Sequence, residues 1–208
     1  SAFSLTSLTL AAWIKVSGVI SAVDANPSVD SSTSVKKYTG FFLQDDTGKG
    51  TYDGIYVYYV WASNSQAKVP VVGKKITLTG FYDEYYDLSE LKNVSWTESG
   101  TGTITATEVD ASKFTSDKTY GPKYEGMLVK VKSVEVGEMA KTTKGSVIGI
   151  KDKTTKAAFE IQLYDFLKPA SPAVAPKVGD KFTSITGVLT YSYSAWVVYP
   201  RGAADFAK

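Results

Sequence analysis

The chain has 208 residues, of which 43% are hydrophobic and 21% are charged, a balance typical of a folded globular protein. It contains no histidine and no cysteine, which excludes a Ser-His-Asp triad, a cysteine nucleophile and a zinc site with nitrogen or sulfur ligands. The formal net charge is only +2, and every basic residue except Arg201 is lysine, which disfavours sequence-specific reading of duplex DNA. We expect no catalytic residue, no metal and no cofactor.

The hydrophobic residues are spread through the chain in short runs. None approaches the roughly 18 residues that a membrane-spanning helix needs, so we expect no membrane span. The first residues, Ser1-Ala2-Phe3, lack the basic start and the apolar stretch of a signal peptide. If the protein is secreted, its leader has been removed.

The first half of the chain alternates β-branched and aromatic residues between clusters of turn formers, which predicts strands. A polar loop over 24–37 follows the first strand, and a connector over 64–72, with or without a short helix, precedes the fourth. The five predicted strands cover residues 13–23, 38–44, 54–61, 75–82 and 86–96.

The second half repeats this plan after a mostly polar segment. A proline-bearing stretch over 165–177 takes the place of the connector. The predicted strands cover residues 124–136, 146–151, 158–164, 181–191 and 195–199. We therefore expect a first domain over 1–100, an interdomain segment over 101–123 and a second domain over 124–208.

A sequence repeat supports two copies of one domain. Val72-Gly73-Lys74-Lys75 returns as Val178-Gly179-Asp180-Lys181, about 106 residues later. Leu43-Gln44-Asp45-Asp46-Thr47 likewise returns as Ile150-Lys151-Asp152-Lys153-Thr154. A period this long, present only twice, indicates a duplicated domain rather than a solenoid.

Five strands per half, with a long first loop and a connector between the third and fourth strands, is the plan of the OB-fold. An immunoglobulin-like sandwich needs about seven strands in a domain of this size. The expected fold class is therefore all-β, with two tandem five-stranded OB-fold-like Greek-key barrels.

Several short motifs carry a family resemblance across nearly the whole chain. Gly40-Phe41-Phe42-Leu43-Gln44-Asp45 and Gly54-Ile55-Tyr56-Val57-Tyr58 resemble the OB-fold modules attached to bacterial extracellular nucleases, as do Ile185-Thr186-Gly187 and Tyr199-Pro200-Arg201. In such proteins the modules accompany an endonuclease/exonuclease/phosphatase-type catalytic domain. The resemblance implies a bacterial accessory module, secreted or in the cell envelope (periplasmic or extracellular), with its catalytic domain either adjoining or separate.

Strand alternation predicts an aromatic patch on the outer face of the second and third strands. Ile55 and Val57 share one side with the core, which leaves Tyr56, Tyr58 and Phe42 on the other. Aromatic rings flanked by lysines stack on single-stranded bases or on sugar rings. The alternative is that tyrosine is simply favoured in strands. The predicted patch and its neighbours are Lys36, Lys37, Tyr38, Phe42, Tyr56, Tyr58 and Trp61.

Two loop regions add charged candidates. Lys151 and Lys153, within a wider lysine set, are candidates to follow a phosphate backbone, although scattered lysines more often form a solvated surface. The turn between the fourth and fifth strands carries tyrosines and acids; it borders the OB-fold groove, and its acids oppose phosphate. The Asp-rich loops around Asp30 and Asp45 do not match calcium-loop spacing, and turn formation explains them equally well.

The leading hypothesis is a non-catalytic module that binds single-stranded nucleic acid with little sequence preference, accessory to an extracellular nuclease system. The alternative is a structural or adhesive module that binds protein or glycan at the cell envelope. The near-neutral net charge favours the alternative, whereas the family resemblance favours nucleic acid.

Overall fold

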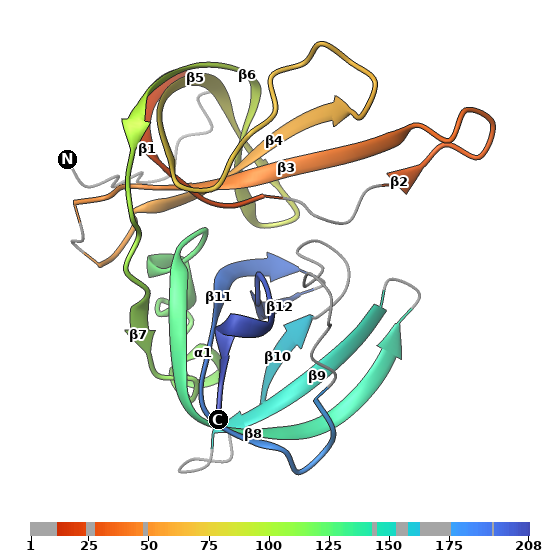
Figure 1. Ribbon diagram of the computed structural model, residues 1–208. Helices are drawn as coiled ribbons and strands as arrows, with labels where there is room; N and C mark the ends of the chain where they lie inside the picture. The colour runs from red at the N-terminus through yellow and green to blue at the C-terminus, as the bar shows by residue number, and fades with distance from the viewer. Residues whose placement is uncertain are drawn as a thin grey trace.

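The computed structural model describes residues 12–23, 28–47, 50–142, 145–152, 158–162, 176–192 and 194–208; side chains are described outside 138–162. These residues are nearly all β-structure, arranged as two barrels that lie one above the other in Figure 1. The helical segments are short: α1 (Lys113–Ser116), η1 (Gly121–Lys123) and η2 (Ala203–Asp205). None of the described helices has the length and apolar character that crossing a bilayer requires.

The first barrel is a closed five-stranded sheet. Its strands follow the order β1-β5-β6-β4-β3, and β3 pairs back onto β1 to close the barrel. All these pairings are antiparallel except that of β4 with β6. This is the Greek-key barrel of the OB-fold. The strands are β1 (Trp13–Val23), β3 (Lys36–Gln44), β4 (Gly54–Ala62), β5 (Lys74–Tyr85) and β6 (Leu88–Thr101), with β2 (Ser28–Val29) at the edge of β3.

The second barrel has the same connectivity. Its order is β8-β11-β12-β10-β9, closed by β9 on β8, and its one parallel barrel pair is β10 with β12. Two short strands extend it: β7 (Thr107–Val109) beside β8 and β13 (Phe206–Ala207) beside β11. The barrel strands are β8 (Leu128–Thr142), β9 (Gly145–Asp152), β10 (Ala158–Gln162), β11 (Lys181–Ser192) and β12 (Ala195–Tyr199).

The repeated Val-Gly motif forms the same turn in both barrels. The Gly73 N–H donates to the Ile20 carbonyl in β1 at 2.9 Å, and the Gly179 N–H donates to the Val136 carbonyl in β8 at 2.9 Å. In each copy the N–H of the residue after this glycine donates a hydrogen bond to the carbonyl three positions earlier, Lys74 to Val71 and Asp180 to Lys177. The sequence repeat therefore corresponds to a structural one.

Each barrel encloses its own apolar core, built from the inward side of alternating strands. The core of the first barrel consists of Ile20, Phe41, Leu43, Val57, Ile76, Leu78 and Leu91. The core of the second includes Met127, Val129, Val131, Ile185, Leu189 and Val198, and it also takes in Val109, Ala111 and Phe114 from the segment between the halves.

A third apolar cluster joins the two barrels. From the first barrel it takes residues on the outward side of β1, β3 and β4, and from the second it takes residues of β8, β11 and β12. Its members are Ala22, Phe42 and Tyr56, facing Leu128, Val188, Val197 and Tyr199. The second barrel therefore covers part of the face that OB-folds use for ligands.

Polar contacts fix the barrels in register. The Gln44 side-chain oxygen, buried at the end of β3, accepts a hydrogen bond from the Leu128 N–H at 2.8 Å. Nearby, a Cβ atom on Gly54 would lie 2.3 Å from the carbonyl carbon of Gly126, so only glycine permits this backbone approach. A buried hydrogen bond and a backbone contact of this kind specify one arrangement of the two barrels.

The predicted all-β class with two five-stranded barrels is confirmed, and a strand is present at each predicted place. The differences lie at strand ends and in connections. The β5–β6 hairpin is longer than predicted, because Tyr86 and Asp87, with φ of 48° and 63°, form its tight turn instead of starting a strand. The connector over 64–72 contains no helix, and β2 lies within the predicted loop over 24–37. We retain the domain boundaries as a proposal, noting that β7 and α1 pack with the second barrel.

Candidate binding groove

A groove of about 600 Å³ lies between the barrels. One wall is the outward face of β3 and β4 together with the β5–β6 hairpin, and the other is the β11–β12 hairpin, which faces the first barrel in Figure 1. We call it the inter-barrel groove. It is lined by Thr39, Phe42, Tyr56, Tyr58, Asp83, Tyr85, Leu88, Glu90, Lys92, Thr190, Tyr191, Ser192 and Tyr199.

A buried carboxylate, Glu90, faces this groove. On β6 the neighbouring Leu91 lies in the core of the first barrel, so alternation turns Glu90 outward. Glu90 is only 6% exposed as a residue, and its carboxylate forms no hydrogen bond or ion pair with any residue in the described ranges. Its oxygens nevertheless keep contact with solvent, since no fully buried side-chain oxygen among the described residues lacks a hydrogen-bond partner. Burial raises the pKa of Glu90, an effect that the Lys92 ammonium opposes and the Asp83 carboxylate reinforces.

The other two charged residues of the groove neutralise each other. Asp83 on β5 and Lys92 on β6 form an ion pair across the hairpin. The hydrogen bond from Lys92 lowers the pKa of Asp83, and the same contact raises the pKa of Lys92. Because Asp83 forms the ion pair with this ammonium, Lys92 acts on Glu90 only at longer range, and Glu90 is the carboxylate of the described lining that forms no ion pair or hydrogen bond.

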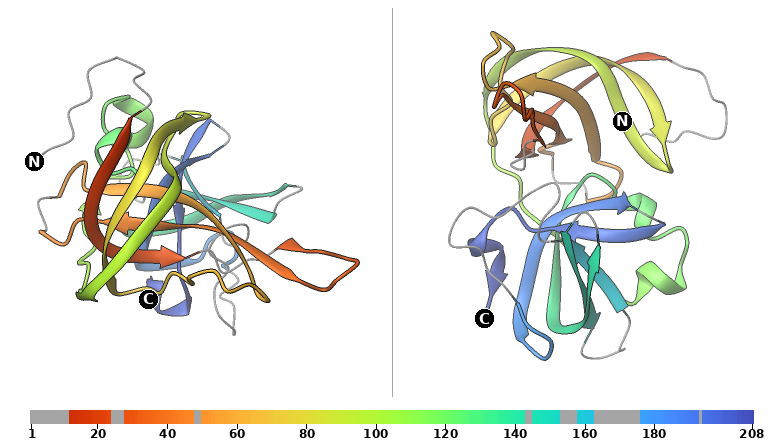
Figure 2. Two further views of the ribbon diagram at one scale, coloured as in Figure 1. Left: turned by 90° about the horizontal axis from the view of Figure 1, so that it is seen from above. Right: turned by 90° about the vertical axis from the view of Figure 1, so that its right-hand side faces the viewer.

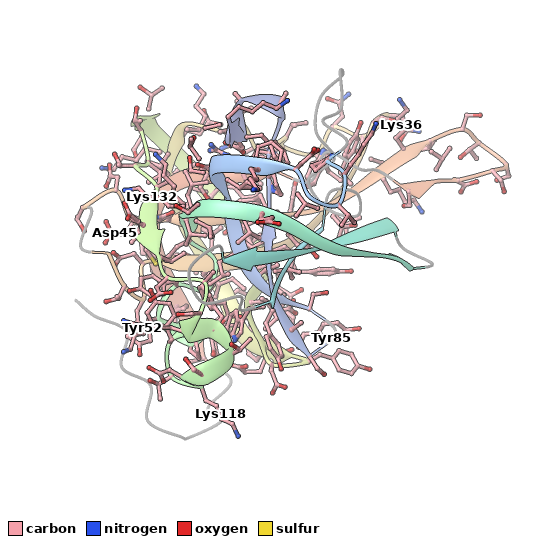
Figure 3. The ribbon with its side chains drawn as sticks, turned by 90° about the horizontal axis from the view of Figure 1, so that it is seen from below. Lys36, Asp45, Tyr52, Tyr85, Lys118 and Lys132 are labelled. Atoms are coloured by element: carbon pink, nitrogen blue, oxygen red, sulfur yellow. The ribbon has the colours of Figure 1, made fainter. Side chains whose placement is uncertain are left out.

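Tyrosine rings form much of the remaining lining. Tyr58 and Tyr85 are 45% and 59% exposed, and Tyr191 and Tyr199 approach from the second barrel. Tyr85 extends outward at the edge of the molecule in Figure 3 and contacts Tyr86 with ring centroids 4.6 Å apart. The groove thus combines apolar ring faces with the carboxylate of Glu90, which forms no ion pair with a described residue.

A half-buried carboxylate, Glu125, links the barrels beside the groove. It accepts hydrogen bonds from the Ser89 N–H at 3.1 Å and the Ser89 hydroxyl at 3.3 Å. Burial raises the pKa of Glu125 to about 7, and the nearby carboxylates of Glu84 and Asp87 add to the rise. Partial burial raises the pKa of the Tyr82 phenol to about 12, and the hydrogen bond that its hydroxyl donates to Glu84 adds to the rise.

The predicted aromatic patch is only partly exposed. Phe42 and Tyr56 face outward from the first barrel as alternation requires, but they are 1% and 6% exposed because the second barrel packs on them. The expectation of an open platform at these two residues is therefore corrected. They form the floor of the inter-barrel groove, and Tyr58 is the member of the predicted patch that stays open to solvent.

Tyr38 and Trp61 belong to a different group of rings. Tyr38 stacks on Trp61 at 5.3 Å and 11°, and Trp61 stacks on Tyr59, which contacts Trp96. A β-bulge between Thr39 and Phe41 interrupts the alternation of the strand pair and separates these rings from the groove. Trp61 is only 5% exposed because the rings of Tyr38 and Tyr59 stack on it.

The predicted lysines are not brought together with the groove. Lys36 and Lys37 are exposed at the start of β3, and Lys36 lies in Figure 3 where the β2–β3 hairpin leaves the barrel, away from Tyr85. Neither forms an ion pair with a described residue. The side chain of Lys151 and the whole of Lys153 lie outside the described residues.

The aspartates of the two loops act as turn formers where they are described. The Asp30 carboxylate accepts hydrogen bonds from the Ser32 N–H and hydroxyl, which lower the pKa of Asp30. Asp45 accepts from the Thr47 N–H at 2.9 Å, and Asp46 pairs with Lys75 at 2.7 Å. No group of three potential metal ligands occurs among the described residues.

Sequence reasoning named Phe42, Tyr56 and Tyr58 but missed Glu90 and the second-barrel wall. Alternation on β6 gives the direction of Glu90 once its register is known, because Leu91 is the apolar residue next to it. No local pattern in the sequence indicates that the β11–β12 hairpin packs against the first barrel. That wall is a product of domain packing.

Comparisons with known proteins place the chain among remote structural neighbours only. No protein-family model and no curated protein matches it. The HINa domain of Ifi202, solved with a 20-base-pair double-stranded DNA, is 12% identical with a TM-score of 0.40 over 91% of this chain and 93% of that one. The p204 HINb domain is 14% identical with a TM-score of 0.39 over 92% and 95%.

A murine DNA-binding protein bound to double-stranded DNA is 13% identical with a TM-score of 0.36 over 89% of this chain and 90% of that one. A likeness this remote says nothing about what this chain binds. The resemblance to nuclease-associated modules has no support from these comparisons.

Proposed function

We propose that this protein is a non-catalytic binding module and that the inter-barrel groove is its ligand site. The observation that carries the proposal is Glu90, a largely buried residue whose carboxylate has no hydrogen-bond donor among the described residues and faces a groove of about 600 Å³. Its oxygens stay accessible from the groove and have no donor within the described ranges, so they are available to accept hydrogen bonds from a ligand. A groove of this size fits a small ligand or a short segment of a polymer.

The charge of the groove favours a protein or glycan ligand over nucleic acid. Glu90 and Asp83 line it, and Asp83 already engages Lys92, the one lysine among the described lining residues. Nucleic-acid affinity comes chiefly from lysine and arginine contacts to phosphates, and an unpaired carboxylate repels them. Tyrosine faces next to hydrogen-bonding groups suit sugar rings and polypeptide side chains equally.

Single-stranded nucleic acid is the second candidate, at a different surface. Lys36 and Lys37 are exposed beside the Tyr38–Trp61 stack and have no ion pair within the described ranges. Such lysines attract phosphates, and the attraction weakens steeply as salt rises. Binding there would leave the inter-barrel groove empty.

The two candidates are separated by titrating a labelled single-stranded oligonucleotide at low and moderate salt, with wild type and with the double variant Lys36→Ala/Lys37→Ala. We expect no oligonucleotide binding that depends on these lysines. Salt-sensitive binding that the double variant abolishes would support the second candidate and contradict the first. A glycan array and a set of immobilised peptides then test the groove, with Tyr58→Ala as the groove variant.

We also propose a secreted or cell-envelope location and a role beside a separate or adjoining catalytic domain, both of which rest on the sequence resemblance. Antibody detection of the native protein in culture medium, envelope and cytosol fractions tests the location. Recovery in the cytosol alone would contradict it.

A further inference from the structure

We propose that the inter-barrel groove binds a cationic side chain, a lysine or arginine of a partner polypeptide, with Glu90 as the residue that sets this specificity. The inference rests on the proposed function, since it assumes that the groove is a ligand site, and it names the chemistry of the ligand.

Glu90 presents a carboxylate to the groove without a hydrogen-bond donor from the described residues. Its side chain is 6% exposed, it faces the groove, and none of the described residues donates a hydrogen bond to it. The carboxylate oxygens remain accessible from the groove, and a positively charged donor forms a stronger hydrogen bond with a carboxylate than a neutral hydroxyl does. The Lys92 ammonium forms its ion pair with Asp83 and attracts Glu90 only at longer range.

Acidic residues outnumber basic ones among the described residues in and around the groove. Asp83 lies directly opposite Glu90 on the neighbouring strand, and the hairpin end beyond them carries Glu84 and Asp87. Glu125 lies beside this region in the second barrel, and because burial raises its pKa to about 7 it adds only part of a negative charge near neutral pH. Among the described lining residues Lys92 is the only cation, against two carboxylates, and this excess of negative charge favours a cationic ligand.

Tyrosine rings from both barrels line the groove. Tyr58 and Tyr85 are open to solvent at the groove, and Tyr191 and the largely buried Tyr199 line it from the other barrel. Ring faces attract ammonium and guanidinium groups, and they also pack against the aliphatic stem that carries such a group. Rings and a buried carboxylate together accept both parts of a lysine or arginine side chain.

The test uses the full chain labelled with ¹⁵N and three probes: the capped peptide Gly-Gly-Lys-Gly-Gly, the same peptide with acetylated lysine, and a neutral glucose tetrasaccharide. Glu90→Gln keeps the shape and an acceptor oxygen but removes the charge. Glu98→Gln is the matched control, because Glu98 lies on the same strand outside the groove and pairs with Lys68 and Lys74. Tyr58→Ala tests whether binding occurs in the groove at all.

We expect the lysine peptide to shift the amide signals of groove residues and the acetylated peptide to leave them unchanged. Glu90→Gln should weaken the peptide at least tenfold, and Glu98→Gln should change its affinity less than twofold. Equal loss in both glutamine variants would show unspecific charge attraction and overturn the proposal.

Two other outcomes distinguish failure of the ligand class from failure of the site. If the tetrasaccharide binds in the groove, loses affinity in Tyr58→Ala and binds Glu90→Gln as well as wild type, the cationic ligand is wrong and the groove stands. If no probe moves groove signals, or Tyr58→Ala changes no affinity, both the cationic ligand and the groove are overturned. Unchanged spectra of the free variants verify that each one folds.

Discussion

At the scale of single residues, Glu125 ties protonation to the contact between the barrels. Its pKa of about 7 in the folded protein lies above the ordinary value of 4.5, because burial and the neighbouring acids disfavour the charged form. The folded state therefore binds this proton more tightly than the unfolded chain. Its stabilising contribution is full below pH 4.5 and is lost as the pH rises through 7.

This contribution predicts that Glu125→Gln flattens the pH dependence of stability. The shift from 4.5 to about 7 corresponds to roughly 3 kcal/mol lost by the wild type across that range. The free energy of unfolding, measured with urea on both sides of the range, should fall more in wild type than in Glu125→Gln. Glu98→Gln, an exposed glutamate on β6, should keep the wild-type slope. Parallel curves for Glu125→Gln and wild type would contradict the assignment.

At the scale of elements, the outward face of β3 and β4 has two parts with different roles. Phe42 and Tyr56 are buried against the second barrel, whereas Tyr58 is open at the groove. Gly40, with φ of 82°, makes room for this packing, because a Cβ there would lie 2.2 Å from the Tyr56 hydroxyl. One strand face therefore serves both domain packing and the candidate site.

We expect Phe42→Ala to lower the free energy of unfolding by about 3–5 kcal/mol, since it opens a cavity in a packed apolar cluster. Tyr58→Ala removes an exposed ring from the same face and should change stability by less than about 0.5 kcal/mol. Chemical denaturation of both variants gives the comparison. A small effect of Phe42→Ala would mean that the barrels do not pack on this residue in solution.

The elements were largely predictable from sequence, whereas the site was not. Alternation assigned Ile55 and Val57 to the core and Phe42 and Tyr56 to the other face, as observed. It failed at Tyr38, where a bulge breaks the period, and at the β5–β6 turn, where non-glycine residues adopt positive φ. Glu90 gains its significance from burial between domains, which depends on contacts far apart in the chain.

At the scale of the whole molecule, the two barrels are held as one body in the arrangement of Figure 2. An apolar cluster, the Gln44–Leu128 hydrogen bond and the contact of Gly54 with Gly126 span the interface. Arg201 adds a further link, since it donates to the Ser21 carbonyl at 3.3 Å while paired with Asp205. Separating the barrels would expose all of these groups.

We therefore expect wild type to unfold in a single cooperative transition, with calorimetric and van't Hoff enthalpies equal. Gly54→Val, which places a branched side chain against the Gly126 backbone, should split the transition into two by separating the barrels. Two transitions already present in wild type would show that the barrels are independent domains joined by a linker.

The most direct test of the inter-barrel groove as the ligand site uses the absence of cysteine from the sequence, which makes a single introduced thiol specific. Tyr58→Cys introduces a thiol in the groove, and Val60→Cys introduces one on the same strand outside the groove lining. The native residues at these positions are similarly exposed, at 45% and 47%. Each introduced thiol is coupled to a bulky maleimide, and the affinities for the lysine peptide, the tetrasaccharide and the oligonucleotide are measured. We predict that the label at position 58 lowers the affinity at least tenfold for whichever of these ligands the unlabelled protein binds. The label at position 60 should leave that affinity unchanged. Equal affinity of both labelled proteins would contradict it.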